Sequence, residues 1–197
     1  NRVIHQASPD QLSRQLDESL TRLKTDYLDI YQLHWPDPKV PLKDCIKALE
    51  SMVKEGRIRS WGVGNLSTTE HALLPRNRRI VHQVHHNMIE DQSEILRIGH
   101  LENRCFNLCY SPFEQGLLLN PDRFQTLGKG DYRRRNKHFK STQSIQKAQR
   151  LTQNIEVADR PSQIISELLR QPHVDGVIFG ARTESQLQSA LGRKPTK

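Results

Sequence analysis

The sequence predicts an α/β fold built around a parallel sheet. Short apolar stretches alternate with longer stretches whose apolar residues recur at helical spacing, a pattern typical of βαβ units. The clearest stretch is 25–36, where a buried strand over 27–33 is followed at once by His34 and then stopped by Pro36. A histidine at the carboxyl end of a barrel strand lies where barrel folds keep their chemistry.

The first helix is expected to begin at Ser8. Ser8 is a favourable N-cap, Pro9 suits the first helical position, and Gln11 completes a capping box. The strand over 27–33 follows this helix. The apolar residues of the helix form one stripe at helical spacing, which consists of Leu12, Leu16, Leu20 and Leu23.

A second helix is expected over 42–55, with Gly56 at its carboxyl end. Its inward face consists of Ile46, Leu49, Met52 and Val53. The same alternation continues to the end of the chain. It predicts further strands at 58–63, 80–86, 105–110 and 174–179, and helices at 68–74, 92–101, 143–157, 161–171 and 183–191.

The polar stretch 113–142 has no clear periodicity, and loops of this length are usually lids, binding loops or disordered segments. The five expected strands are fewer than the eight of a closed barrel, which typically takes about 250 residues. Five strands of a barrel would leave two open sheet edges, which pair readily with other chains. The sheet is therefore either open or part of a barrel, and its open edges would favour self-association.

The composition excludes a membrane-spanning or disordered chain. Hydrophobic residues make up 35% and charged residues 26% of the 197 residues, and the apolar residues are periodic. No apolar run approaches the roughly 20 residues that a membrane helix needs. No signal-peptide pattern opens the chain, so we expect a cytoplasmic protein with no membrane partner. The three cysteines form no disulfide framework, and we expect reduced thiols.

The net charge of +8 favours an anionic partner, either nucleic acid or a phosphorylated cofactor. The densest basic run is 133–137, with only Tyr132 and Phe139 as aromatic neighbours. Because no nucleic-acid-binding signature surrounds this run, we expect no nucleic-acid partner and place the run in a cofactor-side or solvent loop.

Three histidines lie close together near the end of one expected strand. His82 and His86 share one face of that strand, whereas His85 points to the other face. This alternation is a poor geometry for three ligands of one metal ion, so we expect no metal site.

Six stretches, taken in chain order, carry motifs at the ends of the expected strands: 19–36, 55–67, 83–87, 110–118, 130–136 and 177–186. As an ordered set they resemble the aldo-keto reductases, closest to the bacterial general-stress and potassium-channel β-subunit branches. The resemblance runs through almost the entire chain, from strand four to strand eight of the family. It implies a parallel (β/α)8 TIM barrel that lacks its first three strands here, with residues 1–197 as the carboxyl-terminal portion of one domain.

The resemblance implies an NADP-dependent oxidoreductase that reduces aldehydes or ketones by hydride transfer. His34 matches the catalytic histidine, which binds and polarises the small-molecule carbonyl substrate. The amides of Asn65 and Gln83 could hold the nicotinamide carboxamide through paired hydrogen bonds, and Tyr110 could stack on the nicotinamide ring. The other positions that match cofactor-binding residues are Ser111, Gly116 and Leu117 beside the diphosphate, and Gly180, Arg182 and Gln186 around the 2′-phosphate.

Some residues of the family pattern are not found in this sequence. Of the four active-site residues only His34 is present, because the aspartate, tyrosine and lysine belong to earlier strands. We therefore expect these 197 residues alone to lack general acid–base catalysis worth about 10²–10⁴-fold. Gly64 replaces the usual serine, and Ser189 and Ala190 replace a glutamate–asparagine pair that holds the adenine. The alternative to an enzyme is a catalytically inactive relative that acts as a binding or scaffold protein.

Overall fold

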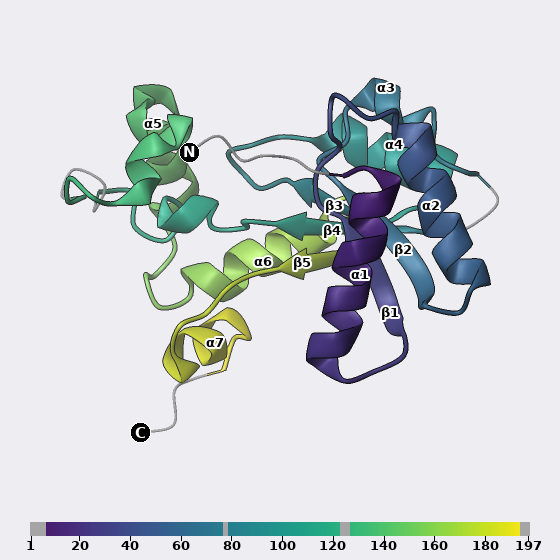
Figure 1. Ribbon diagram of the computed structural model, residues 1–197. Helices are drawn as coiled ribbons and strands as arrows, with labels where there is room; N and C mark the ends of the chain where they lie inside the picture. Colours follow the sequence, from purple (N-terminus) through teal and green to yellow (C-terminus); the bar gives the residue numbers. More distant parts are fainter. Residues whose placement is uncertain (1–6, 77–78, 123–126, 194–197) are drawn as a thin grey trace. The chain divides into compact units, whose positions relative to one another are not determined.

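The computed structural model describes residues 7–76, 79–122 and 127–193 and has the expected α/β organisation (Figure 1). Five strands form one sheet in the order β1-β2-β3-β4-β5, so chain order and sheet order coincide. The β1–β2 and β2–β3 pairs are parallel, as the alternation of helices and strands predicts. The strands are β1 (Leu28–Leu33), β2 (Ile58–Gly64), β3 (Val81–His85), β4 (Phe106–Tyr110) and β5 (Gly176–Ile178).

Seven α-helices are found among the described residues, close to their expected positions: α1 (Pro9–Leu23), α2 (Leu42–Lys54), α3 (Thr68–His71), α4 (Ser93–Asn103), α5 (Thr142–Thr152), α6 (Arg160–Arg170) and α7 (Glu184–Ala190). The described part of the polar stretch 113–142 includes the 3₁₀ turns η1 (Glu114–Gly116), η3 (Tyr132–Arg135) and η4 (Lys137–Lys140), and residues 123–126 lie outside the described residues. No helix in the described ranges is both long and apolar enough to cross a membrane.

The expected helix over 143–157 was too long, because α5 ends at Thr152. The guanidinium of Arg160 donates to the backbone oxygens of Thr152 and Ile155, each over 3.2 Å. A basic side chain can satisfy the last carbonyl groups of a helix in place of a further helical turn. The end of α5 is thus set by a contact that helical periodicity does not register.

The chain divides into two compact units, and each is described by itself. The first unit comprises Asn1–Val84 and Glu94–Leu108, and the second comprises His85–Ser93 and Cys109–Lys197. Each unit has its own cluster of buried apolar side chains. In the second unit this cluster includes Leu117, Leu118, Ile164 and Leu168.

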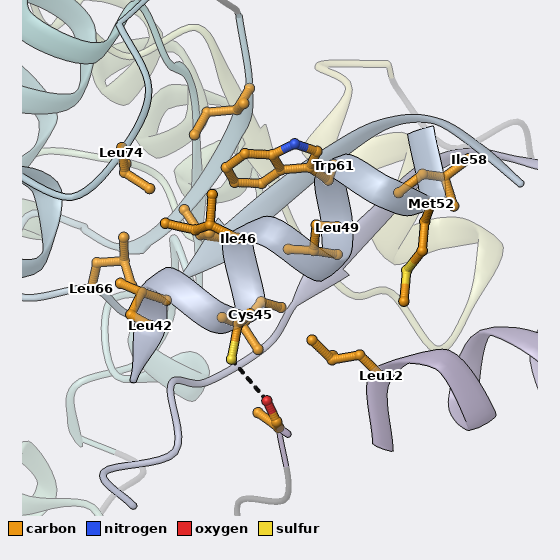
Figure 2. Close-up of a cluster of buried hydrophobic side chains, with 14 of the residues drawn as sticks. Leu12, Leu42, Cys45, Ile46, Leu49, Met52, Ile58, Trp61, Leu66 and Leu74 are labelled. Carbon is orange, nitrogen blue, oxygen red and sulfur yellow. Dashed lines mark hydrogen bonds between the residues drawn. The ribbon is translucent and has the colours of Figure 1, made fainter. Parts of the chain in front are cut away.

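The core of the first unit is built by the inward faces of α1 and α2 and by β2 (Figure 2). Leu49 and Trp61 are completely buried, and the Trp61 indole N–H donates to Glu50 Oε1 over 2.9 Å. A buried indole needs such a partner for its only polar group. Gly56 follows α2 in the left-handed conformation with a φ of 75°, as expected for a glycine at a helix end.

Burial in the first unit departs from the apolar pattern at the end of α1, and the expectation of a buried strand at β1 is wrong. Leu23, the last residue of the α1 stripe, is 64% exposed, because it lies in the final turn beside the left-handed Lys24. The β1 strand is mostly not buried: Leu33 is buried, whereas Ile30 is 48% exposed. β1 stands at one end of the strand order, and a terminal strand has a neighbouring strand on one side only.

Replacing Gly62 with alanine is expected to destabilise the first unit by about 2 kcal/mol. A Cβ at this position would lie 2.7 Å from the backbone oxygen of Val81, and that oxygen belongs to the neighbouring strand and has little freedom to move. Thermal melts of the Gly62→Ala and Gly128→Ala variants would check this. A Cβ at Gly128 meets nothing within 4 Å, so similar melting temperatures for the two variants would contradict the account.

Candidate active site

Three residues expected at the site lie on neighbouring strands in the first unit, two of them directly after a strand. His34 directly follows β1, Asn65 directly follows β2, and Gln83 lies within β3. The Asn65 side-chain Nδ2 donates to the backbone oxygen of His34 over 2.9 Å, and the Asn65 backbone N–H donates to the oxygen of Gln83 over 3.2 Å. Asn65 therefore connects the other two residues.

The backbone around Asn65 is unusual. Asn65 adopts the left-handed conformation with a φ of 60°, which asparagine tolerates better than most residues. A Cβ on the preceding Gly64 would lie 3.0 Å from the His34 oxygen, closer than an ordinary contact. This close approach gives a physical reason for glycine at the position where the aldo-keto reductase pattern usually has serine.

Gln32 is a member of this group that the sequence analysis missed. Its Oε1 accepts a hydrogen bond from the Nε2 of Gln83, although Gln32 lies on β1 and Gln83 on β3. The strand between them carries Gly62, whose absent Cβ would lie 3.0 Å from the Gln32 side chain. The sequence feature that could have revealed Gln32 is a polar residue between Tyr31 and Leu33, at the end of an apolar strand.

In the second unit, the expected residues Ser111, Gly116 and Leu117 lie on a tight loop that follows Tyr110, the last residue of β4. Gly116 has a φ of 99° and Leu117 is completely buried. Ser111 and two residues of the η1 turn also have positive φ values, which are strained for residues other than glycine. Such strain persists only where the surrounding contacts hold it, and it is found most often at functional sites.

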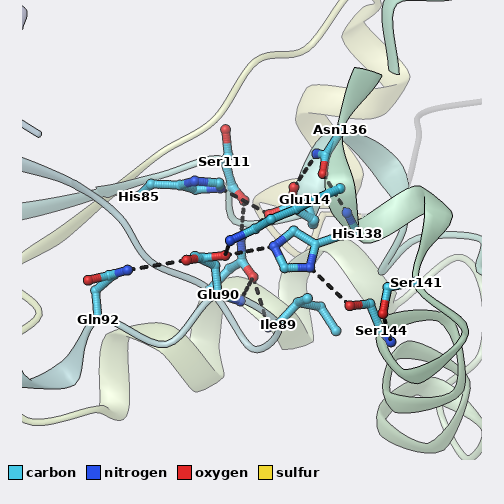
Figure 3. Close-up of polar contacts among 12 residues, drawn as sticks. His85, Ile89, Glu90, Gln92, Ser111, Glu114, Asn136, His138, Ser141 and Ser144 are labelled. Carbon is cyan, nitrogen blue, oxygen red and sulfur yellow. Dashed lines mark hydrogen bonds and ion pairs between the residues drawn. The ribbon is translucent and has the colours of Figure 1, made fainter. Parts of the chain in front are cut away.

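Glu114, which the sequence analysis also missed, holds this loop (Figure 3). Its side chain is completely buried and accepts hydrogen bonds from His85 Nε2 over 2.9 Å, Asn87 Nδ2 over 2.8 Å and Asn136 Nδ2 over 2.5 Å. Burial raises the pKa of this carboxyl, but the hydrogen bonds from these three residues outweigh burial and lower the pKa to about 2. In the sequence, Glu114 stands between Phe113 and the apolar run 117–119, with Gln115 beside it, and no local pattern distinguishes it.

The Tyr110 ring, expected to face the nicotinamide, packs against His85, the last residue of β3. The two ring centroids are 5.1 Å apart and the ring planes differ by 14°, so the rings are stacked. Burial raises the pKa of the Tyr110 phenol, and the negative charges of Glu114 and Glu90 add to the effect. The phenol is therefore neutral over the physiological range.

Glu90 forms a second acidic centre of the same unit (Figure 3). Its Oε2 binds His138 Nε2 over 2.7 Å and Lys137 Nζ over 2.8 Å. The other ring nitrogen of His138 lies 3.0 Å from the Ser144 hydroxyl at the start of α5. Burial raises the pKa of Glu90, but the hydrogen bonds from Lys137 and His138 outweigh burial, so the net effect is a lowered pKa. Glu90 therefore holds the η4 turn as an anion.

The three histidines of the β3 region have different partners. His82 is completely buried in the first unit, where its Nδ1 lies 3.1 Å from Asn107 Oδ1. His85 binds Glu114, as described above. His86 lies in the second unit, where its Nε2 is 2.6 Å from Gln171 Oε1 and its Nδ1 accepts from the Gln92 N–H over 3.0 Å.

The expected 2′-phosphate residues lie around the start of α7, after Gly180. The Arg182 backbone N–H donates to Gln186 Oε1 over 2.8 Å, and the Gln186 N–H donates to the N-cap hydroxyl of Thr183 over 3.2 Å. The Arg182 side chain is exposed, and its guanidinium forms no hydrogen bond or ion pair with any residue that the structure describes.

The basic run lies near Arg182. The pKa of Asp131 is lowered to about 2, chiefly by hydrogen bonds from Arg133 and also by the positive charge of Arg182. Arg134 donates to the backbone oxygen of Leu127 over 2.7 Å. The run is thus partly neutralised by Asp131, and the exposed Arg182 side chain is one of the cations available to an anion.

The sequence model described as "Aldo/keto reductase family" matches residues 2–193. The aldo-keto reductase YhdN of Bacillus subtilis is 28% identical over 201 residues, a match that covers 96% of this chain and 60% of YhdN. The NADH-specific methylglyoxal reductase of Escherichia coli is 32% identical, with 56% of this chain and 36% of that protein covered. The chain thus spans less than two thirds of the length of these relatives.

Solved structures show the same fold. The glycerol dehydrogenase of Gluconobacter oxydans matches with a TM-score of 0.75 and 22% identity, over 97% of this chain and 62% of that one. The thermostable aldo-keto reductase Tm1743 matches with a TM-score of 0.63 and 24% identity, over 97% of this chain and 64% of that one. The five-stranded sheet with its helices therefore has the arrangement of the corresponding part of these TIM-barrel structures.

Proposed function

Because the chain belongs to the aldo/keto reductase family, we propose that it is part of an NADP-dependent oxidoreductase that reduces aldehydes or ketones by hydride transfer. The observation that carries this proposal is the hydrogen-bonded arrangement of His34 and Asn65, at the carboxyl ends of β1 and β2, with Gln83 of the adjacent parallel strand β3. In barrel enzymes, residues at these strand ends bind the substrate and perform the chemistry.

The described residues fit an anionic dinucleotide. The Arg182 guanidinium has no partner among the described residues and can bind a phosphate through a planar set of donors. The Oε1 of Gln83 has no hydrogen-bond partner among the described residues, because only its Nε2 is engaged, so it can accept from a carboxamide N–H. Tyr110 presents a neutral aromatic ring for stacking, and the loop with Ser111, Gly116 and Leu117 would contact the diphosphate.

His34 is the residue proposed to act on the substrate. Its side chain is exposed directly after β1, and its backbone oxygen is anchored by Asn65. The nicotinamide would supply the hydride, and negative charge would then develop on the carbonyl oxygen. A hydrogen bond from the His34 imidazole to that oxygen would stabilise this charge.

We further propose that the complete protein contains the barrel strands that precede β1, together with an aspartate, a tyrosine and a lysine. The share of YhdN that the chain covers, 60%, supports this proposal. The tyrosine, with its pKa lowered by the lysine, would protonate the developing alkoxide. His34 alone does not provide this tyrosine–lysine pair. In this reading the substrate is a small carbonyl compound and the protein is cytoplasmic.

Replacing Arg182 with alanine is expected to weaken NADPH binding about 10- to 100-fold and NADH binding less than about twofold. A charged hydrogen bond to the 2′-phosphate is worth about 1.5–3 kcal/mol, and NADH lacks that group. Fluorescence titrations of the purified protein with both cofactors would measure the two dissociation constants. The exposed Arg150 provides the control, since Arg150→Ala removes the same charge from α5. Equal weakening of both cofactors by Arg182→Ala would reject the assignment.

A further inference from the structure

His85 and Tyr110 end two strands of the sheet, and their rings lie nearly parallel with centroids 5.1 Å apart. One face of the Tyr110 ring is therefore covered by an imidazole. A ring packed in this way has fewer orientations available, so its other face is held in a defined plane. If Tyr110 stacks on the nicotinamide, the orientation of that plane decides the orientation of the cofactor ring.

His85 is itself held by Glu114. The carboxylate is completely buried and its pKa is lowered to about 2, so it is an anion at neutral pH. An ionised carboxylate only accepts hydrogen bonds, so the Nε2 of His85 must carry the proton in the 2.9 Å contact. Nδ1 of His85 has no partner among the described residues, and thus Glu114 alone fixes the rotation of the imidazole.

The fold does not require this arrangement. Burying a charge is expensive, and well-packed apolar residues usually stabilise a protein as well as a buried ion pair does. Here a buried glutamate stands on a strained backbone with a φ of 44°, in contact with a histidine side chain that is still 33% exposed. Strained polar groups of this kind are typical of positions where geometry matters more than stability.

We propose that His85 is a positioning residue that holds the Tyr110 ring in the plane required for stacking on the nicotinamide, and that Glu114 orients His85 for this purpose. This inference rests on the proposed function, because it assumes that Tyr110 contacts the cofactor. It assigns to His85 a role through Tyr110 and no direct contact with the substrate.

The test separates the ring of His85 from its hydrogen bond. His85→Gln keeps a donor for Glu114 but removes the ring, whereas His85→Phe keeps a ring in the same place. We expect His85→Gln to weaken NADPH binding about tenfold and His85→Phe to restore it to within about threefold of the unchanged protein. His138→Gln is the matched control, because His138 also binds a carboxylate of this unit, Glu90, and should leave NADPH binding unchanged.

A second measurement needs no cofactor. The chain has four tyrosines, so 3-fluorotyrosine labelling gives four ¹⁹F resonances, and Tyr110→Phe identifies the one from Tyr110. His85→Gln is expected to shift or broaden this resonance, and His138→Gln to leave it in place. An unchanged Tyr110 resonance in His85→Gln would overturn the inference even if NADPH binds. A shifted resonance in a protein that binds no NADPH would support the positioning of Tyr110 and reject the proposed function instead.

Discussion

Replacing Glu114 with alanine is expected to destabilise the second unit by about 3 kcal/mol, because buried hydrogen-bond donors left without an acceptor cost about 1–3 kcal/mol each. Three donors, from His85, Asn87 and Asn136, would lose their shared acceptor. The strained turn would also lose the contacts that keep Glu114 at a positive φ. Urea unfolding followed by hydrogen exchange of amides in α5 and α6 would measure the loss.

The control for Glu114 is Glu167→Ala in the same unit. Glu167 forms an exposed ion pair with Arg170, and such pairs contribute about 0–1 kcal/mol. If the two variants lost similar amounts of stability, Glu114 would not hold the loop. Acid should act in the same direction as the substitution: the folded-state pKa of Glu114 lies below its unfolded value, so its contribution is present above about pH 4.5 and is lost as the pH falls toward 2.

As the pH falls, the first unit is expected to lose stability earlier than the second unit, between about pH 6.5 and pH 4. His71 and His82 are completely buried with their rings 4.6 Å apart, and their Nε2 atoms have no hydrogen-bond partner among the described residues. Burial, followed by the proximity of His71, lowers the pKa of His82 to about 3 against the hydrogen bond to Asn107. Burial also lowers the pKa of His71, although Asn103, Glu102 and Glu70 oppose it.

The sign of the effect follows from these shifts. Both histidines bind protons less readily in the folded state, so the unfolded state takes up more protons as the pH falls below 6.5. A fall from pH 6.5 to 4.5 should reduce the free energy of unfolding by about 2–3 kcal/mol. Tryptophan fluorescence in urea reports on this unit, since both tryptophans, Trp35 and Trp61, belong to it.

His82→Gln retains a side-chain hydrogen-bonding group for Asn107 and removes the most strongly shifted histidine. Its stability should therefore vary less between pH 6.5 and 4.5 than that of the unchanged protein. His173→Gln, in the second unit, should keep the full pH dependence. An undiminished pH dependence in His82→Gln would show that other groups cause the acid sensitivity.

The sequence predicted those features of the fold that depend on neighbouring residues. The N-cap at Ser8, the glycine after α2 and the five strands could be found because capping and periodicity act within a few positions. Periodicity identifies an apolar face but does not say how well that face is covered. For this reason the exposure of Leu23 and Ile30 was missed.

The site was only partly predictable for the same physical reason. The resemblance predicted which strand-end residues belong to the site, but the groups that contact them are distant in sequence. Glu114 binds His85 across 29 positions and Asn136 across 22, and Gln32 meets Gln83 across 51. No local pattern encodes such pairs. A lone polar residue between Tyr31 and Leu33, as at Gln32, is the one such clue in the sequence.

The central claim is that this chain supplies the cofactor-binding and histidine part of an NADPH-dependent carbonyl reductase. The most direct test is NADPH oxidation with a reactive aldehyde, such as a nitrobenzaldehyde, by the chain alone and by the chain preceded by its upstream coding sequence. The account predicts little turnover by the chain alone, and turnover by the extended protein that falls on the order of 10²-fold or more in His34→Ala. An extended protein that binds NADPH but reduces no aldehyde, or one whose rate is unchanged by His34→Ala, would contradict the claim.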